Sequence, residues 1–165
     1  MDNKTIAVLG GGSWGTVLAN LAAEKGFNTI LWMRDLAVVD QVNLQKKNTK
    51  YLPDYGLSKN LKATTEIEAI SAADLVVFCI PSDSFRNIAE KAEPFIQPKA
   101  HVVTATKGVE EGGFVLMSHI LKEILGDDRS IGVLSGPNLA GEIANGQITG
   151  TVIASSSEEL QTFFI

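Results

Sequence analysis

The sequence predicts a doubly wound α/β fold, in which a mainly parallel sheet carries helices on both faces. Short β-branched runs alternate with longer segments of helical period, beginning with a strand at 5–9 and a helix at about 13–25. This alternation is typical of βαβ units. The run 75–80 is apolar without interruption, as expected for a parallel strand covered on both faces. A glycine-rich segment, 10–15, separates the first strand from the first helix.

Further strands and helices follow in the same alternation. We expect strands at 29–33, 61–63, 75–80, 102–106, 131–134 and 151–154, with room for a helix in each interval. Helix starts are predicted by three capping patterns, which are Thr65 with Glu68, Ser156 with Glu159, and Asp83 or Ser84 after Pro81. The polar stretch 46–50 predicts an exposed turn.

Length and charge restrict the class of protein. The 165 residues suffice for one domain, 1–165, with a sizeable core. A formal net charge of −5 disfavours nucleic acid or an anionic membrane as the main partner, so local features must hold any anionic ligand. The single cysteine, Cys79, excludes an intramolecular disulfide and suits a reducing cytoplasm, and we expect it to be a packing residue. His101 and His119 offer no metal-ligand spacing, and no apolar run could span a bilayer.

The end of the sequence is apolar. A helix from about Ser156 runs into Phe163, Phe164 and Ile165. Natural chains seldom end on three exposed apolar residues, which favours a fragment over an end whose aromatic rings dock on the domain. If a following segment is missing, these three side chains would leave an apolar patch that favours self-association.

The segment 10–15 has the form G-x-G-x-x-G between a strand and a helix. In this context Gly10 permits the tight turn, Gly12 lets the backbone approach a pyrophosphate, and Gly15 lets the helix pack closely on the strand. The N-terminus of the helix offers free N–H groups and about half a positive charge to a phosphate. The sequence therefore predicts a Rossmann-type dinucleotide site.

The end of the second strand indicates which dinucleotide is bound. NAD-preferring versions of this fold carry an acidic residue roughly 20 residues after the glycine motif, and here Arg34 lies nineteen residues after Gly15. An arginine can pair with a 2′-phosphate and stack on adenine, which favours NADP. Asp35 follows directly. If Asp35 points inward, NAD would be accepted too, whereas its alternative role is to cap the helix that begins near Leu36.

Three further side chains fall at the carboxyl ends of expected strands, where ligands of open α/β sheets bind. Phe85 could cover a cofactor ring or be the first core residue of the following helix. Lys107 could hold a substrate phosphate or carbonyl oxygen, or be a solvated surface lysine. Asn138 follows Gly136 and Pro137 in a strand-to-helix turn, which predicts a second helix start that can receive an anion.

Several motifs together are more specific than the glycine turn. They are GGGSWGT at 10–16, YLP at 51–53, NLKATT at 60–65, ADLVV at 73–77, ATKG at 105–108 and LSGP at 134–137. In this order they closely resemble the bacterial type of NAD(P)-dependent glycerol-3-phosphate dehydrogenase, over essentially the whole chain. The resemblance implies hydride transfer between NAD(P)H and dihydroxyacetone phosphate, giving sn-glycerol 3-phosphate for phospholipid synthesis. It implies cofactor contacts at Ser13, Trp14, Arg34, Phe85, Lys107 and Ala140, and substrate contacts at Lys107, Gly136 and Asn138.

Two differences from that family limit what the resemblance implies. The family has Ser and Phe after Gly-Pro, whereas this chain has Asn138 and Leu139. The family also places its lysine acid–base, and the Arg-Asn pair that grips the substrate phosphate, in a helical C-terminal domain beyond these residues. We therefore expect no catalytic residue within this chain, dinucleotide binding with negligible turnover, and a homodimer of the full protein.

Two other functions stay open. The first is a related β-hydroxyacid or ketopantoate-type dehydrogenase, which reads a carboxylate where the phosphate would be. The Thr-Lys-Gly and Ser-Gly-Pro segments argue against it. The second is a dinucleotide-sensing module with no chemistry of its own.

Overall fold

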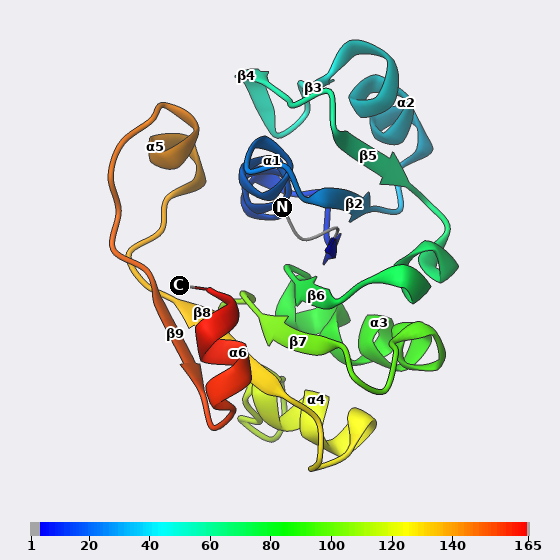
Figure 1. Ribbon diagram of the computed structural model, residues 1–165, viewed down its shortest axis with the longest axis vertical. Helices are drawn as coiled ribbons and strands as arrows, with labels where there is room; N and C mark the ends of the chain where they lie inside the picture. The colour runs from blue at the N-terminus through cyan, green and yellow to red at the C-terminus, as the bar shows by residue number, and fades with distance from the viewer. Residues whose placement is uncertain (1–3, 165) are drawn as a thin grey trace.

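The predicted doubly wound sheet is confirmed. The computed structural model describes residues 4–164, and within them seven strands form one sheet in the order β5-β2-β1-β6-β7-β8-β9 (Figure 1). All neighbours are parallel except β8 and β9, which run antiparallel. The strands are β1 (Thr5–Leu9), β2 (Asn28–Trp32), β5 (Leu61–Thr64), β6 (Leu75–Phe78), β7 (His101–Thr104), β8 (Ile131–Ser135) and β9 (Val152–Ser155).

Helices cover both faces of this sheet. Successive strand residues point to opposite faces, so Val8 and Val77 pack with α1, α2 and α6, whereas Leu9 and Phe78 pack with η1, α3 and α4. The helices are α1 (Ser13–Glu24), α2 (Leu36–Gln45), α3 (Phe85–Ala92), α4 (Met117–Leu125), α5 (Ala140–Ala144) and α6 (Glu158–Phe163), with 3₁₀ turns η1 (Ile67–Ala72), η2 (Ser82–Ser84) and η3 (Glu93–Phe95). Among the described residues, no helix combines the length and apolar character needed to cross a membrane.

The exposed turn expected at 46–50 is confirmed for 49–50, whereas 47–48 form a strand and Asn48 is buried. This stretch belongs to an antiparallel hairpin, β3 (Lys47–Asn48) and β4 (Leu52–Gly56), which lies beside α1 and α2 (Figure 1). Asn48 is fully buried, because its side chain packs against the start of α1. The polar sequence of this stretch gives no sign of this burial, because only the tertiary contact shows that buried groups accept from the Nδ2 group of Asn48.

The helix caps differ from all three predicted ones. Ser157, not Ser156, caps α6, because its Oγ accepts from the Leu160 N–H at 3.2 Å. Thr65 and Glu68 form no capping box, since η1 follows Glu66 with no side-chain cap. Ser84 precedes α3 as expected, but its hydroxyl donates to Asp83 and neither side chain caps the helix.

The chain after β8 leads into a helix as expected, but the helix is short and begins three residues beyond Pro137. Anion binding at its start stays a prediction. Helix α5 begins only at Ala140 and has five residues. Pro137 therefore lies before the helix and outside its first turn. A helix this short offers little dipole to an anion.

The two histidines, Trp32 and the C-terminal phenylalanines differ in how far they are exposed. Trp32 is buried, and its indole Nε1 donates to the Thr65 carbonyl at 2.8 Å. His101 is buried at the start of β7, and His119 is exposed on α4. The Phe163 ring lies 4.4 Å from the Lys4 Nζ and packs on the sheet, whereas Phe164 is 38% exposed. Ile165 lies outside the described residues.

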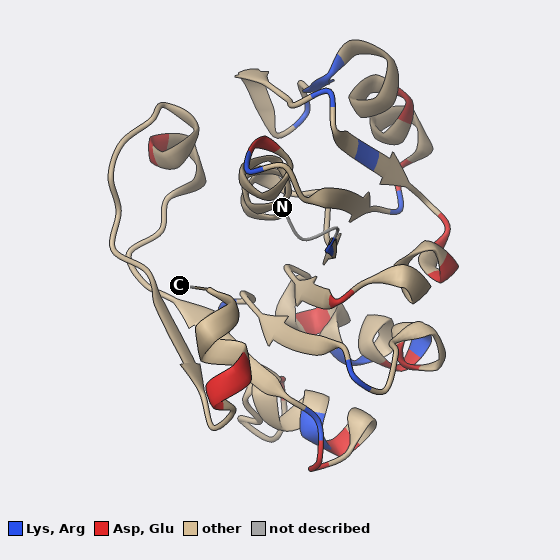
Figure 2. Cartoon of the chain, in the orientation of Figure 1, with Lys and Arg blue, Asp and Glu red and all other residues tan. Residues whose placement is uncertain are grey.

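Charges of both signs are spread over the helices, with α3 and α4 each carrying acidic and basic residues (Figure 2). One cluster ties three elements together. The Arg86 guanidinium on α3 contacts the Glu110 carboxylate at 2.6 Å and the Glu123 carboxylate on α4 at 2.8 Å. Glu110 follows Lys107 by three residues, so this ion pair anchors the loop that carries the lysine.

This cluster predicts an acid-sensitive part of the stability. The hydrogen bond from Arg86 holds the pKa of Glu110 below its usual value. A lowered native pKa stabilises the fold above the unfolded-state pKa, and this contribution is lost as the pH falls through the native value. Glu110→Gln should therefore lower the unfolding midpoint at neutral pH, with a difference from the unchanged chain that shrinks below about pH 4.

Thermal unfolding at a series of pH values measures this difference. Glu111→Gln is the matched control, because among the described residues Glu111 makes no ion pair. A pH-independent effect of Glu110→Gln would contradict the prediction.

Candidate cofactor site

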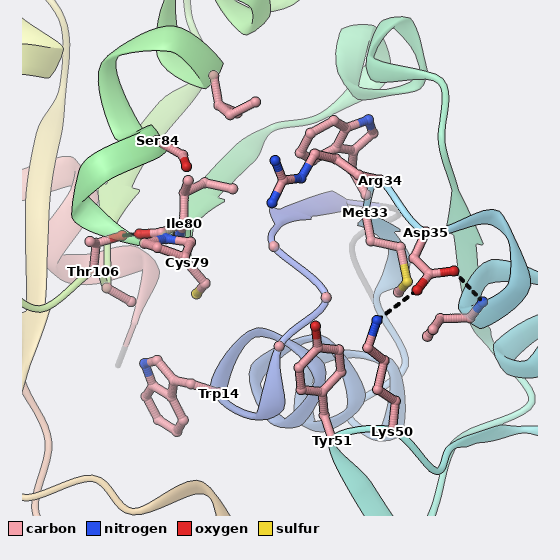
Figure 3. Close-up of a pocket in the computed structure, with 18 of the residues that line it drawn as sticks. Trp14, Met33, Arg34, Asp35, Lys50, Tyr51, Cys79, Ile80, Ser84 and Thr106 are labelled. Atoms are coloured by element: carbon pink, nitrogen blue, oxygen red, sulfur yellow. Dashed lines mark hydrogen bonds and ion pairs between the residues drawn. The ribbon is translucent and has the colours of Figure 1, made fainter.

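A cleft of about 580 Å³ opens at the carboxyl ends of the strands. It lies where β1 and β6 are neighbours and the chain turns to opposite sides, through β2 and β5 on one side and through β7 and β8 on the other. Ligands of open α/β sheets bind at this switch point. Its lining includes Gly10, Gly11, Gly12, Trp14, Arg34, Asp35, Lys50, Tyr51, Cys79, Thr106, Lys107 and Asn138 (Figure 3).

The glycine turn forms the floor of the cleft, and each glycine has its own reason. Gly10 has φ +123°, and a Cβ there would lie 2.3 Å from the Cys79 carbonyl oxygen. A Cβ on Gly15 would lie 1.9 Å from the Gly10 oxygen. Gly12 differs, because its Cβ position has nothing within 4 Å. Two glycines thus allow close packing, and the third keeps the space above the turn free.

Helix α1 begins at this turn and directs its free N–H groups at the cleft. Gly12 is the N-cap residue and provides no side-chain cap, and the first turn contains no acidic residue. Unpaired N–H groups and the helix dipole at such a start attract phosphate. The Trp14 ring lines the cleft, whereas the Ser13 hydroxyl donates to the Tyr51 carbonyl at 3.2 Å.

Arg34 and Asp35 follow β2 and have different surroundings. The exposed Arg34 side chain points into the cleft (Figure 3). Both oxygens of Asp35 are engaged, Oδ2 by the Lys50 Nζ at 2.8 Å and Oδ1 by the Val38 N–H at 3.4 Å. The Lys50 hydrogen bond holds the pKa of Asp35 below its usual value. The expected capping role of Asp35 is therefore confirmed, and its carboxylate is occupied.

The opposite end of the cleft contains Lys107 and Asn138. The Lys107 Nζ donates to the Asn138 carbonyl at 3.3 Å. Asn138 is 6% exposed, and its Oδ1 accepts from the Thr151 hydroxyl at 2.9 Å and the Thr149 hydroxyl at 3.4 Å. The threonines thereby leave the Nδ2 group of Asn138 as its available donor. A cation and an amide donor lie here within reach of a small oxygen-rich ligand.

The predicted site residues divide into two groups. Those that line the cleft are Gly10, Gly12, Trp14, Arg34, Lys107 and Asn138, and those that do not are Ser13, Gly15, Phe85, Gly136 and Ala140. Phe85 is fully buried in the core, with its ring 5.5 Å from that of Phe78. Gly136 has φ +148°, and a Cβ there would lie 2.4 Å from the Gly150 oxygen, so it shapes the turn that carries Asn138.

Sequence reasoning missed the contribution of the hairpin. Lys50 and Tyr51 line the cleft, and Asn48 contacts the glycine turn from below. The YLP motif at 51–53 was the available signal, but no local pattern places it at the cofactor end of the sheet.

Cys79 also lines the cleft, directly beyond β6. Burial raises the pKa of its thiol to about 12. The group therefore stays protonated near neutral pH and is a poor nucleophile. This agrees with the expected packing role.

A family model described as the N-terminus of NAD-dependent glycerol-3-phosphate dehydrogenase matches residues 5–161. This chain belongs to that family. It is 48% identical over 162 residues to a glycerol-3-phosphate dehydrogenase [NAD(P)+] of Saccharophagus degradans, covering 97% of this chain and 45% of the relative. The chain thus spans about half the length of the curated relatives that it matches.

Solved structures agree with this assignment. A glycerol-3-phosphate dehydrogenase from Coxiella burnetii superposes with a TM-score of 0.92 at 32% identity, covering 99% of this chain and 50% of that one. A ketopantoate reductase from Ralstonia eutropha reaches only 0.64 at 20% identity, covering 80% of this chain and 41% of that one. The second likeness shows a shared fold and nothing more.

The glycine turn predicts two opposite mutational effects. Gly15→Ala forces a methyl group onto the Gly10 carbonyl, so the free energy of unfolding should fall by about 2 kcal/mol or more. Gly12→Ala meets open space, so stability should change by less than about 1 kcal/mol. The methyl group should nevertheless weaken dinucleotide binding, because it occupies the space above the turn. Urea unfolding and calorimetric titration measure both effects, and a strongly destabilised Gly12→Ala would contradict this account.

Proposed function

We propose that this chain is the dinucleotide-binding part of an enzyme that interconverts dihydroxyacetone phosphate and sn-glycerol 3-phosphate with NAD(P)H, for glycerophospholipid synthesis. Membership of the family, together with a cleft that has the glycine turn at its floor and Lys107 with Asn138 at one end, supports this function most directly. The single cysteine fits action in a reducing cytoplasm.

The residues of the cleft have separate roles in this proposal. The glycine turn and the start of α1 bind the pyrophosphate, and the nicotinamide ring of the bound cofactor supplies or accepts the hydride. Lys107 and the Asn138 amide then hold substrate oxygens by charge-assisted and neutral hydrogen bonds. Within the proposal Gly136 acts through the backbone by positioning Asn138, and Ala140 and Ser13 contact the cofactor only after local movement.

The full protein is proposed to carry more than this chain. The relatives are about twice as long, which leaves room for the helical C-terminal domain that the resemblance implies. That domain would supply the lysine acid–base and the Arg-Asn pair for the substrate phosphate. A homodimer of the full protein stays a prediction of the resemblance, and light scattering would measure it.

This division predicts where activity is found. The full-length protein should reduce dihydroxyacetone phosphate and should not reduce ketopantoate, because the proposed site reads a phosphate. The present chain alone should bind NADPH but show negligible turnover. Loss of nicotinamide absorbance on a panel of both substrates measures this, and clear reduction by the chain alone would overturn the division.

We also propose that NADP is preferred to NAD. Arg34 offers a free guanidinium to the cleft, while Lys50 and the helix cap occupy both oxygens of Asp35. A ribose 2′-OH would have to compete with these partners for the carboxylate, whereas a 2′-phosphate gains a bidentate arginine. The Asp35–Lys50 pair is partly exposed, so its effect is on selectivity more than on stability.

The preference gives a mutational prediction. Arg34→Ala should weaken NADPH binding about tenfold to a hundredfold, since a hydrogen bond to a charged group contributes about 1.5–3 kcal/mol, and should leave NADH binding nearly unchanged. Lys50→Met should shift selectivity toward NADH, because it frees Asp35. Lys47→Met, on an exposed lysine of the same hairpin, is the control. Trp14 fluorescence or calorimetry measures both ligands, and equal losses for both would exclude Arg34 as the 2′-phosphate reader.

A further inference from the structure

We propose that Asn48 is a positioning residue of the pyrophosphate site. Its amide holds the Gly11 carbonyl so that the N–H of Gly12 faces the cleft. The proposal rests on the dinucleotide binding proposed above, and it assigns to the β3–β4 hairpin a part in that binding.

The contact is a closed polar network beneath the glycine turn. The Asn48 Nδ2 group donates to the Gly11 carbonyl at 3.0 Å and to the Thr16 hydroxyl at 2.9 Å. The Thr16 hydroxyl also donates to the Gly11 carbonyl, at 3.4 Å. Asn48 and Thr16 are both 0% exposed. The Gly11 oxygen is therefore fixed from two sides, away from solvent.

The planarity of the peptide transmits this orientation to the ligand side. Gly11 C=O and Gly12 N–H belong to one trans peptide unit and point in opposite directions. Because the oxygen points toward Asn48, the hydrogen points away from it, toward the free space at Gly12. The Gly12 N–H donates to no atom within residues 4–164. It is thus a pre-oriented donor for a phosphate oxygen.

Three consecutive glycines make this control necessary. Glycine has the largest conformational freedom of all residues, so the turn 10–12 can adopt other peptide orientations at small cost. A side chain at Gly11 cannot stiffen it, because a Cβ there would lie 2.7 Å from the Met33 Cβ. The restraint must therefore come from outside the turn, and Asn48 provides it from the hairpin.

The surroundings of the Asn48 Oδ1 atom indicate that the side chain acts through the two N–H groups of its Nδ2. It is buried and has no hydrogen-bond partner among the described residues. An unsatisfied buried acceptor costs about 1–3 kcal/mol, which an apolar side chain of the same size would avoid. The two hydrogen bonds that Nδ2 donates, and not the packing of the side chain, therefore explain why an asparagine stands at position 48.

Asn48→Leu tests the proposal with two ligands. NADPH has a pyrophosphate, whereas adenosine 2′-monophosphate reaches Arg34 without one. The variant should bind NADPH about tenfold more weakly, as expected for one lost buried hydrogen bond, and should bind adenosine 2′-monophosphate as the unchanged chain does. Thr16→Val should show the same pattern with a smaller loss, and it provides a second variant if Asn48→Leu does not fold.

Asn20→Leu is the matched control. Asn20 is also a fully buried asparagine that ties this region to α1, by a 2.8 Å bond to the Tyr55 hydroxyl and a 2.6 Å bond from the Ser58 N–H. It lies about 12 Å along the helix from Gly12, so its loss should lower stability without changing NADPH affinity. Unchanged NADPH affinity in Asn48→Leu, or equal weakening of both ligands, would overturn the positioning role. Failure of the unchanged chain to bind NADPH would overturn the proposed function, and the role of Asn48 with it.

Discussion

The close contact between the start of α1 and the end of β1 determines the arrangement of the site. Helix α1 starts so near the sheet that a methyl group at Gly15 would overlap the Gly10 carbonyl, and one at Gly10 would overlap Cys79. This contact aligns the helix axis with the cleft between β1 and β6, where the N–H groups of its first turn are unpaired. The capacity of the site for phosphate therefore follows from the close packing of α1 on the sheet, which is possible only because Gly10 and Gly15 have no side chains.

An acidic chain holds an anionic ligand here by local arrangement. The net charge is −5, yet the cleft is lined by Arg34, Lys50 and Lys107 and by the positive end of α1. Asp35 is the acidic side chain among the lining residues, and Lys50 pairs with it. The helix cap and a ribose hydroxyl would compete for the same carboxylate. Because the cap and Lys50 hold both oxygens in the folded chain, the proposed reader of a 2′-phosphate is Arg34, whose side chain points into the cleft.

The elements of the fold and of the site that the sequence predicts are those whose formation depends on residues close to one another in the sequence. Strand and helix periodicity predicted a mainly parallel sheet with both faces covered, and the ends of its seven strands lie within two residues of those expected. The glycine turn and the cap at Asp35 depend on neighbouring residues alone, and both are present. The hairpin was not predicted, because the burial of Asn48 depends on partners that lie 32 and 37 residues away in the sequence. For Phe85 the residues alone suited a ring stack and a core equally, and the resemblance implied a cofactor contact. The structure buries its ring in the core.

The hairpin contacts both parts of the site, the glycine turn and Asp35. Asn48 at the glycine turn and Lys50 at Asp35 are two residues apart on one short segment. Gln41 on α2 holds the residue between them, since its Oε1 accepts from the Thr49 N–H at 2.8 Å. A shift of the hairpin would therefore move the support of the pyrophosphate turn and the partner of Asp35 together. In the proposed function, dinucleotide affinity and the choice of the 2′ group would therefore be linked through the hairpin, although the glycine turn follows β1 and Arg34 follows β2.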